Sequence, residues 1–255
     1  MTLQYLYALL SGLLSGGALG MTGGGGSILA VPLLVYLVGQ NVHLAIGTSL
    51  IAVGVTSLIS SVSYMRQSLV KFRIAIFMAA PGLISTYLGA LLNKQFKGPV
   101  LLLFFALLMI YIGYLMTRKK SVKDDTDVPG TVNYPRIILL GFITGFASGF
   151  FGIGGGFLLV PALYLGAKLK MKEAIATSLF TIFLFGTFGL ASYIIQGREV
   201  NLLMSAVFVI GGSLGGIIGA WYAKRLNQAK LRYIFSIFII LIGIGIFAQN
   251  LLKLM

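Results

Sequence analysis

The chain has 255 residues, of which 58% are hydrophobic and only 9% are charged, and its mean hydropathy is +1.00. Soluble globular proteins carry roughly 25% charged residues, so this composition excludes a soluble fold and predicts an integral membrane protein. The formal net charge of +14 would suggest a nucleic-acid partner in a soluble chain, and we exclude that partner here. The absence of cysteine excludes disulfides, thiolate metal sites and cysteine nucleophiles.

Stretches without Lys, Arg, Asp or Glu mark the candidate membrane spans. They run over 1–65, 74–93, 98–117, 137–167, 174–197, 200–223 and 233–252. A helix crosses the hydrocarbon core with about 20 apolar residues, so two of these stretches are too long for one helix. The first must hold several elements, and the 31 residues of 137–167 would form a straight helix of roughly 46 Å. Segment 118–136 has mixed charges and prolines and predicts an aqueous loop.

The two sides of this loop are duplicated. A shift of 129 residues aligns ordered glycines, a proline, Thr-Ser pairs and glutamines, which agree by chance less easily than Leu or Ile. The shift pairs Gly12, Gly16 and Gly20 with Gly141, Gly145 and Gly149; Pro32 with Pro161; Thr48-Ser49 with Thr177-Ser178; and Gln67 with Gln196. After a one-residue slip, Gly82, Gly89 and Gly113 match Gly212, Gly219 and Gly243. Internal duplication is typical of transporter folds.

The distribution of Lys and Arg favours opposite orientations for the two halves. If each half crossed the membrane four times, the two faces would carry 10 and 9 of these residues. If each half crosses an odd number of times, one face keeps only Lys94, Lys97, Arg198 and Lys253, and the other receives the remaining 15 of the 19. The positive-inside rule favours this second arrangement. It predicts termini outside, a cytoplasmic 118–136 loop, and basic residues that attract anionic lipid at the cytoplasmic face.

An odd number of crossings requires a glycine-rich break near the start of each half. We expect helices over 3–21 and 27–37 around a break at 22–26, and over 137–150 and 157–165 around a break at 151–156. Whether each broken segment crosses twice or forms a re-entrant hairpin stays open at this point.

The predicted fold is therefore an all-α polytopic membrane protein of two inverted-topology repeats. The first transmembrane repeat covers 1–117, the charged linker 118–136 and the second repeat 137–255, with about five helical elements in each repeat.

The clustered glycines are the first candidate binding site. Consecutive glycines let the backbone leave helical geometry, and the helix that starts directly afterwards adds the positive end of its dipole. Broken helices at membrane depth persist only where they line a cavity or are buried in protein. We therefore expect an anion to contact Gly23, Gly24, Gly25, Gly26, Ser27, Gly152, Gly154, Gly155 and Gly156. Close helix packing is the alternative for these clusters, and it is the interpretation we favour for Gly12, Gly16 and Gly20, which are spaced four apart.

The duplicated hydroxyl pairs Thr48-Ser49 and Thr177-Ser178 are the second candidate. Each pair lies just inside an apolar helix, at the same place in both halves. Their hydroxyls can donate to an oxyanion or to a carbonyl of their own helix. Because these pairs are duplicated together with the glycine clusters, we include them in the expected substrate site.

The charged and ionisable residues argue against cation transport and against catalysis. The acidic residues are Asp124, Asp125, Asp127, Glu173 and Glu199, and none lies mid-span. Cation carriers usually place a carboxylate inside the membrane. The lone histidine, His43, is expected at a helix start on the outer face, and Arg198 with Glu199 is expected to form a surface pair there. We expect no metal and no cofactor.

The repeated motifs resemble those of the sulfite exporter TauE/SafE family. The first half reads GGGGSILAVPLL and later AIGTSL, and the second half reads GIGGGFLLVPAL and later AIATSL. The similarity covers essentially the whole chain. It implies an inner-membrane carrier of small sulfur-containing anions, such as sulfite or organosulfonates, that usually exports them.

These inferences predict a secondary transporter and not an enzyme. We expect it to export a small oxyanion or sulfonate across the plasma membrane of a bacterium by alternating access, with the glycine breaks and Thr-Ser pairs forming one site between the repeats. A passive anion channel is the first alternative. An intramembrane enzyme that uses His43 as a base, and a membrane scaffold, are the others.

Overall fold

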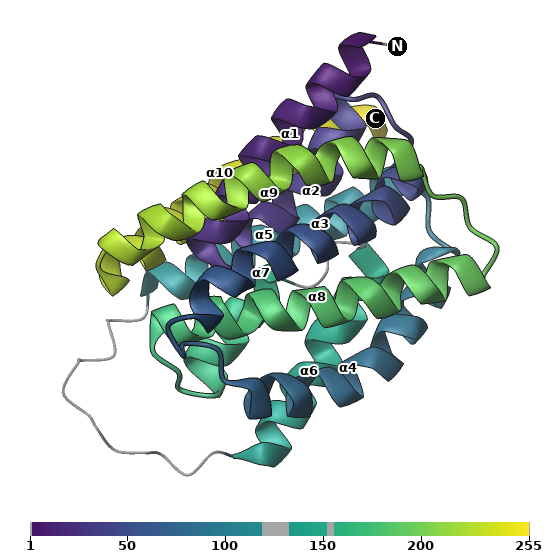
Figure 1. The fold of residues 1–255 in the computed structure, drawn as a ribbon. Helices are drawn as coiled ribbons and strands as arrows, with labels where there is room; N and C mark the ends of the chain where they lie inside the picture. Colours follow the sequence, from purple (N-terminus) through teal and green to yellow (C-terminus); the bar gives the residue numbers. More distant parts are fainter. Residues whose placement is uncertain (1, 119–132, 152–155, 255) are drawn as a thin grey trace.

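The structure, a computed structural model, describes residues 2–118, 133–151 and 156–254, and in these ranges the chain is helical apart from short connections, with no strand (Figure 1). In chain order the elements are α1 (Thr2–Thr22), α2 (Gly25–Tyr36), α3 (Val42–Met65), α4 (Phe72–Asn93), α5 (Gly98–Arg118), α6 (Tyr134–Phe151), α7 (Gly156–Pro161), the π-helix η1 (Ala162–Gly166), α8 (Met171–Ile195), α9 (Leu202–Arg225) and α10 (Gln228–Leu254).

Seven helices of the described ranges are long and apolar enough to cross a membrane, namely α1, α3, α4, α5, α6, α8 and α9. Shorter apolar stretches are α2 and the 236–251 part of α10. Helices satisfy every interior N–H and C=O within the segment, which a hydrocarbon environment requires. The predicted all-helical membrane protein is confirmed.

A helix break lies at the first predicted glycine cluster, and it is shorter than the expected 22–26, because Gly25 and Gly26 belong to α2. α1 ends at Thr22 and α2 begins at Gly25, while α6 ends at Phe151 and α7 begins at Gly156. α6 begins at Tyr134, three residues before the expected start of the second half at 137. The first glycine-rich segment therefore separates two helices, whereas the expected break at 151–156 lies outside the described residues except for Phe151 and Gly156.

The duplication is visible in the backbone. The described residues other than glycine with positive φ are Ser68 and Lys168, and each lies 129 residues from a glycine with positive φ, Gly197 and Gly39 respectively. Equivalent hydrogen bonds close the same turns, because Leu69 N donates to Tyr64 O and Arg198 N to Tyr193 O. The two halves thus share turn geometry as well as motifs.

α3 and α8, which occupy equivalent places in the two halves, form the centre of the bundle. Of the candidate spans they are the most buried, with 61% of each hydrophobic window inside the protein. Gly54 of α3 lies against Gly186 of α8, and Gly47 lies near the Tyr193 ring, so the two helices run antiparallel. The bundle therefore has one end near His43 and the end of α8, and an opposite end near Lys71 and the start of α8.

The first helix of each half packs on the fourth helix of the other half. α1 crosses α9, and α6 crosses α4. A Cβ placed on Gly12, Gly16 or Gly20 would overlap the carbonyl oxygen of Phe208, Gly212 or Gly216 respectively. In the equivalent crossing, a Cβ on Gly141, Gly145 or Gly149 would overlap that of Met78, Gly82 or Thr86. The packing role predicted for the spaced glycines is confirmed, and their partners lie in the other half of the chain.

We expect the substitution Gly16→Ala to destabilise the protein, because its methyl group would overlap the Gly212 backbone. Overpacking of this kind costs about 1–3 kcal/mol, which lowers the midpoint of thermal unfolding in detergent. Gly245→Ala is the matched control, since a Cβ at Gly245 meets nothing within 4 Å and alanine favours a helix by about 1 kcal/mol. Equal midpoints for the two variants would contradict the close crossing.

Candidate functional site

The break between α1 and α2 is built around one glycine with a left-handed backbone. Gly23 has φ of +73°, a conformation that a residue with a Cβ rarely adopts. Its N–H still donates to Leu19 O at 2.7 Å and so closes α1. Thr22 Oγ1 then accepts from Gly25 N at 2.9 Å, which satisfies one of the free N–H groups that begin α2.

Buried serines satisfy the carbonyl groups around this break. Ser27 Oγ donates to Gly24 O at 2.7 Å, and Ser15 Oγ of α1 donates to Gly26 O at 2.6 Å. Ser178 Oγ of α8 donates to Gly23 O at 2.8 Å, across the two halves of the chain. The N-terminus of α2 is therefore held at a fixed, buried position with its dipole directed at the break.

The start of α7 lies beside the start of α2. A Cβ placed on Gly156 would lie 2.7 Å from Ser27 Oγ and 3.2 Å from Gly24 Cα. Ser27 and Gly156 are equivalent positions of the repeat, so the starts of α2 and α7 meet where the halves face each other. The other expected residues of the second cluster, Gly152, Gly154 and Gly155, lie outside the described residues.

The Thr-Ser pairs are buried, but their hydroxyls do not all face the glycine break. Ser178 contacts Gly23, whereas Thr177 Oγ1 accepts from Lys71 N at 3.0 Å. In the first half, Ser49 Oγ donates back to Ile46 O at 2.8 Å. Thr48 Oγ1 is fully buried and has no hydrogen-bond partner among the described residues. Thr48 therefore offers an unused hydroxyl.

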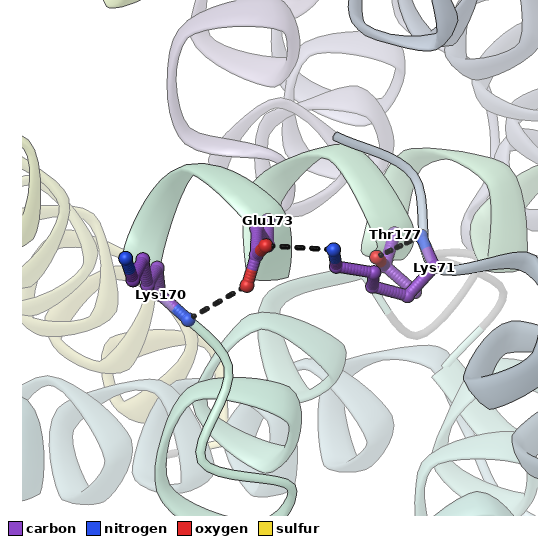
Figure 2. Close-up of polar contacts among 4 residues, drawn as sticks. All are labelled: Lys71, Lys170, Glu173 and Thr177. Carbon is purple, nitrogen blue, oxygen red and sulfur yellow. Dashed lines mark hydrogen bonds and ion pairs between the residues drawn. The ribbon is translucent and has the colours of Figure 1, made fainter. Parts of the chain in front are cut away.

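The Lys71 end of the bundle is held by contacts between the halves (Figure 2). Lys71 Nζ forms an ion pair with Glu173 Oε1 at 2.9 Å, and Glu173 Oε2 accepts from Lys170 N at 3.3 Å. Together with the Lys71–Thr177 hydrogen bond, these contacts join the start of α4 to the start of α8. Sequence reasoning missed this pair, because 102 residues separate Lys71 from Glu173.

The His43 end is held by a side chain that the sequence analysis did not select. Asn93, which is fully buried at the end of α4, donates through Nδ2 to Phe150 O at 2.6 Å. Its Oδ1 accepts from Arg198 Nη1 at 2.8 Å. The expectation that Arg198 pairs with Glu199 is wrong for the described residues, where the ion pair is Lys71–Glu173. His43 lies in the first turn of α3, as expected, with Nδ1 3.3 Å from Asn93 Oδ1.

The part of the chain that the structure describes contains no cluster of side chains that could bind a metal ion. No group of three or more His, Cys, Asp or Glu side chains comes together there. Glu173 and Glu199 lie outside the helix centres, in the first turn of α8 and in the connection to α9. The buried polar groups of the described helices are hydroxyls, amides and backbone groups.

Comparison with known proteins identifies one matching family and relatives that are described as membrane transporters. Residues 8–246 match the sequence model of a family described as sulfite exporter TauE/SafE. The chain is 39% identical over 252 residues to a probable membrane transporter protein of Xylella fastidiosa, which covers 96% of this chain and 95% of that protein. It is 31% identical over 264 residues to the probable membrane transporter protein YunE of Bacillus subtilis, with 94% and 96% covered. No solved structure matches the chain.

We expect Ser178→Ala to lower the thermal unfolding midpoint, because Gly23 O then loses a buried donor, at a cost of about 1–3 kcal/mol. Ser57→Ala is the control. Ser57 is equally buried, but its Oγ donates to Val53 O within α3. That carbonyl oxygen also accepts a backbone hydrogen bond of the helix, so it keeps a donor when Ser57 is replaced. A midpoint for Ser178→Ala no lower than that of Ser57→Ala would contradict the assigned role of Ser178 at the break.

Proposed function

Because the chain belongs to the sulfite exporter TauE/SafE family, we propose that it exports small sulfur-containing anions, sulfite or organosulfonates, across the bacterial inner membrane. Family membership makes it a membrane transporter rather than an enzyme. The choice of anion, the direction and the alternating-access mechanism are our proposals.

The observation that carries the proposal is the contact between the starts of α2 and α7. A helix N-terminus attracts anions through its dipole and its free N–H groups. Ser27 and Ser178 surround the α2 start with buried hydroxyls, and carboxylates lie outside the centres of the described spans. An anion in that place replaces its water with backbone N–H donors, and with the Ser27 and Ser178 hydroxyls once these turn from Gly24 O and Gly23 O, without an opposing negative charge.

The proposed substrate site has a central part and two approaches. The central part comprises Gly23, Gly24, Gly25, Gly26, Ser27, Gly152, Gly154, Gly155, Gly156 and Ser178. Thr48 and Ser49 lie on α3 toward the His43 end, and Thr177 lies on α8 toward the Lys71 end. In the proposed mechanism these hydroxyls contact the anion on its way between the centre and the two ends.

Alternating access requires that the contacts at one end of the bundle break while those at the other end hold. At the Lys71 end, the side chains of the ion pair are 42% and 20% exposed. Exposed pairs contribute about 1 kcal/mol or less, so this contact can open at low cost. A membrane potential that is negative inside favours outward movement of an anion by about 2.3 kcal/mol per charge per 100 mV. Export can therefore proceed without a coupled cation.

The orientation that we propose is an inverted repeat with both termini outside. Two observations support it. The equivalent helices α3 and α8 run antiparallel, which corresponds to a pseudo-two-fold axis across the bundle. Most of the Lys and Arg residues in the described ranges lie at the Lys71 end, and such residues concentrate on the cytoplasmic side.

The transport proposal predicts saturable efflux of radiolabelled sulfite from proteoliposomes. We expect Gly25→Leu to reduce the rate about tenfold or more, because its side chain would fill the site and displace charge-assisted donors worth about 1.5–3 kcal/mol. Ser27→Ala, a smaller change, should raise the KM. Gly245→Leu is the control, on an open face of α10. Efflux that rises linearly with concentration would indicate a channel, and unchanged efflux in correctly folded Gly25→Leu would contradict the site.

The orientation is tested by cysteine labelling, since the natural chain has no cysteine. Gln95 and Asn227 are exposed in connections at opposite ends of the bundle. In intact cells, we expect a membrane-impermeant maleimide to label Gln95→Cys. Asn227→Cys should react only after permeabilisation. The reverse pattern, or equal labelling of both, would overturn the proposed orientation.

A further inference from the structure

A polar pocket of about 280 Å³ lies at the His43 end, away from the glycine breaks. It is lined by Asn41, His43, Leu44, Lys94, Tyr193, Arg198 and Glu199. Since a water molecule takes about 30 Å³ of liquid volume, the pocket has room for a small oxyanion together with several waters.

The guanidinium of Arg198 is held in a fixed orientation at this pocket. Nη1 donates to Asn93 Oδ1 at 2.8 Å, and the Arg198 Cζ lies 4.5 Å from the centre of the Tyr193 ring. Asn93 is itself fully buried and bonded to Phe150 O. A guanidinium has five N–H donors in a planar fork that matches oxyanions. The contact with Asn93 uses one nitrogen, so donors remain for a ligand.

The cationic side chains of the pocket are not neutralised by ion pairs. Within the described ranges, neither Lys94 nor Arg198 forms an ion pair, and the ion pair there is Lys71–Glu173 at the opposite end. Glu199 is the carboxylate of the pocket lining. Apart from His43, two cations and one carboxylate leave one positive charge in the lining. A concave site with that charge attracts anions from solution.

The cluster is not a remnant of the duplication. The shift of 129 residues places Lys172 opposite His43, Leu69 opposite Arg198 and Val70 opposite Glu199. Tyr193 does have an equivalent in Tyr64, but the Tyr64 hydroxyl donates to Gly20 O at 2.7 Å. Lys94 has an equivalent in Lys224 after the one-residue slip. His43, Arg198 and Glu199 have no such equivalent, so their combination with Lys94 belongs to one end of the protein only.

We propose that this pocket binds a small oxyanion such as sulfite, with Arg198 and Lys94 as its cationic donors. His43 lies five residues before Thr48 on α3, a distance of about 7–8 Å along the helix. In this proposal the pocket is a second binding site, which the anion occupies on its way to or from the central site. The role on the transport path rests on the proposed function, whereas binding in the pocket is a separate property.

The single histidine of the chain gives a reporter inside the pocket. We would record the imidazole NMR signals of selectively labelled His43 in the full chain while sulfite is added at constant pH and ionic strength. Wild type should show a saturable shift. Arg198→Gln and Lys94→Gln should weaken the apparent affinity, the former about tenfold. Glu199→Gln should strengthen it about threefold, because a repulsive charge is removed.

Arg225→Gln is the matched control, because Arg225 also stacks on an aromatic ring, that of Trp221 at 3.6 Å, but does not line the pocket. We expect wild-type affinity for this variant. Lys94→Gln changes an exposed side chain, so it tests the site even where loss of Arg198 disturbs folding. The absence of a saturable shift in wild type would overturn the proposal, as would equal affinities in Lys94→Gln and Arg225→Gln.

Sulfite efflux from proteoliposomes of the same proteins separates this proposal from the transport proposal. A saturable His43 shift without efflux would retain the pocket as a binding site and contradict the proposed function. Efflux without a shift would retain the function and contradict the pocket. The expected combination is efflux with a shift, and a raised KM in Lys94→Gln for anion supplied from the His43 end.

Discussion

The architecture depends on two helix crossings in which backbone lies directly against backbone. At both crossings, α1 on α9 and α6 on α4, a glycine takes the place where a Cβ would overlap a carbonyl oxygen. Membrane helices gain no hydrophobic free energy by leaving lipid for each other, so close van der Waals packing between small residues has to supply the stability. Because each crossing joins the first helix of one half to the fourth helix of the other, neither half can form these contacts alone. The starts of α2 and α7 are brought together as a consequence.

The broken helices persist because the surrounding helices satisfy the backbone at the breaks. Gly23 adopts a left-handed conformation, and Ser178 donates to its carbonyl oxygen, while Ser15 and Ser27 add side-chain hydrogen bonds to Gly26 O and Gly24 O. An unsatisfied carbonyl in hydrocarbon would cost several kcal/mol. The same arrangement keeps the start of α2 buried and directs its positive end at the contact with α7. One set of hydrogen bonds therefore stabilises the fold and prepares the proposed anion site.

The two ends of the bundle share turn geometry and differ in their side chains. Turn geometry repeats at Ser68 and Gly197. At the Lys71 end, however, an ion pair joins the halves, while at the His43 end a buried amide, Asn93, joins helices α3, α4, α6 and α8 and orients Arg198. A carrier that opens its ends in turn can use such differences, because each end then has its own cost of opening and its own affinity for the anion.

The sequence by itself determined the membrane class, the duplicated motifs, the helix break after Thr22 and the packing role of the spaced glycines. These features have local signatures: an apolar run, a repeated motif, consecutive glycines and a four-residue spacing. The sequence could not select Asn93 or the pair of Lys71 with Glu173, nor correct the expected pairing of Arg198 with its neighbour Glu199. Those contacts join residues 50 or more positions apart, and their partners are fixed only when helices from both halves pack. Tertiary structure also decided that Ser178 faces the glycine break while Thr177 faces Lys71, because adjacent helical residues point about 100° apart.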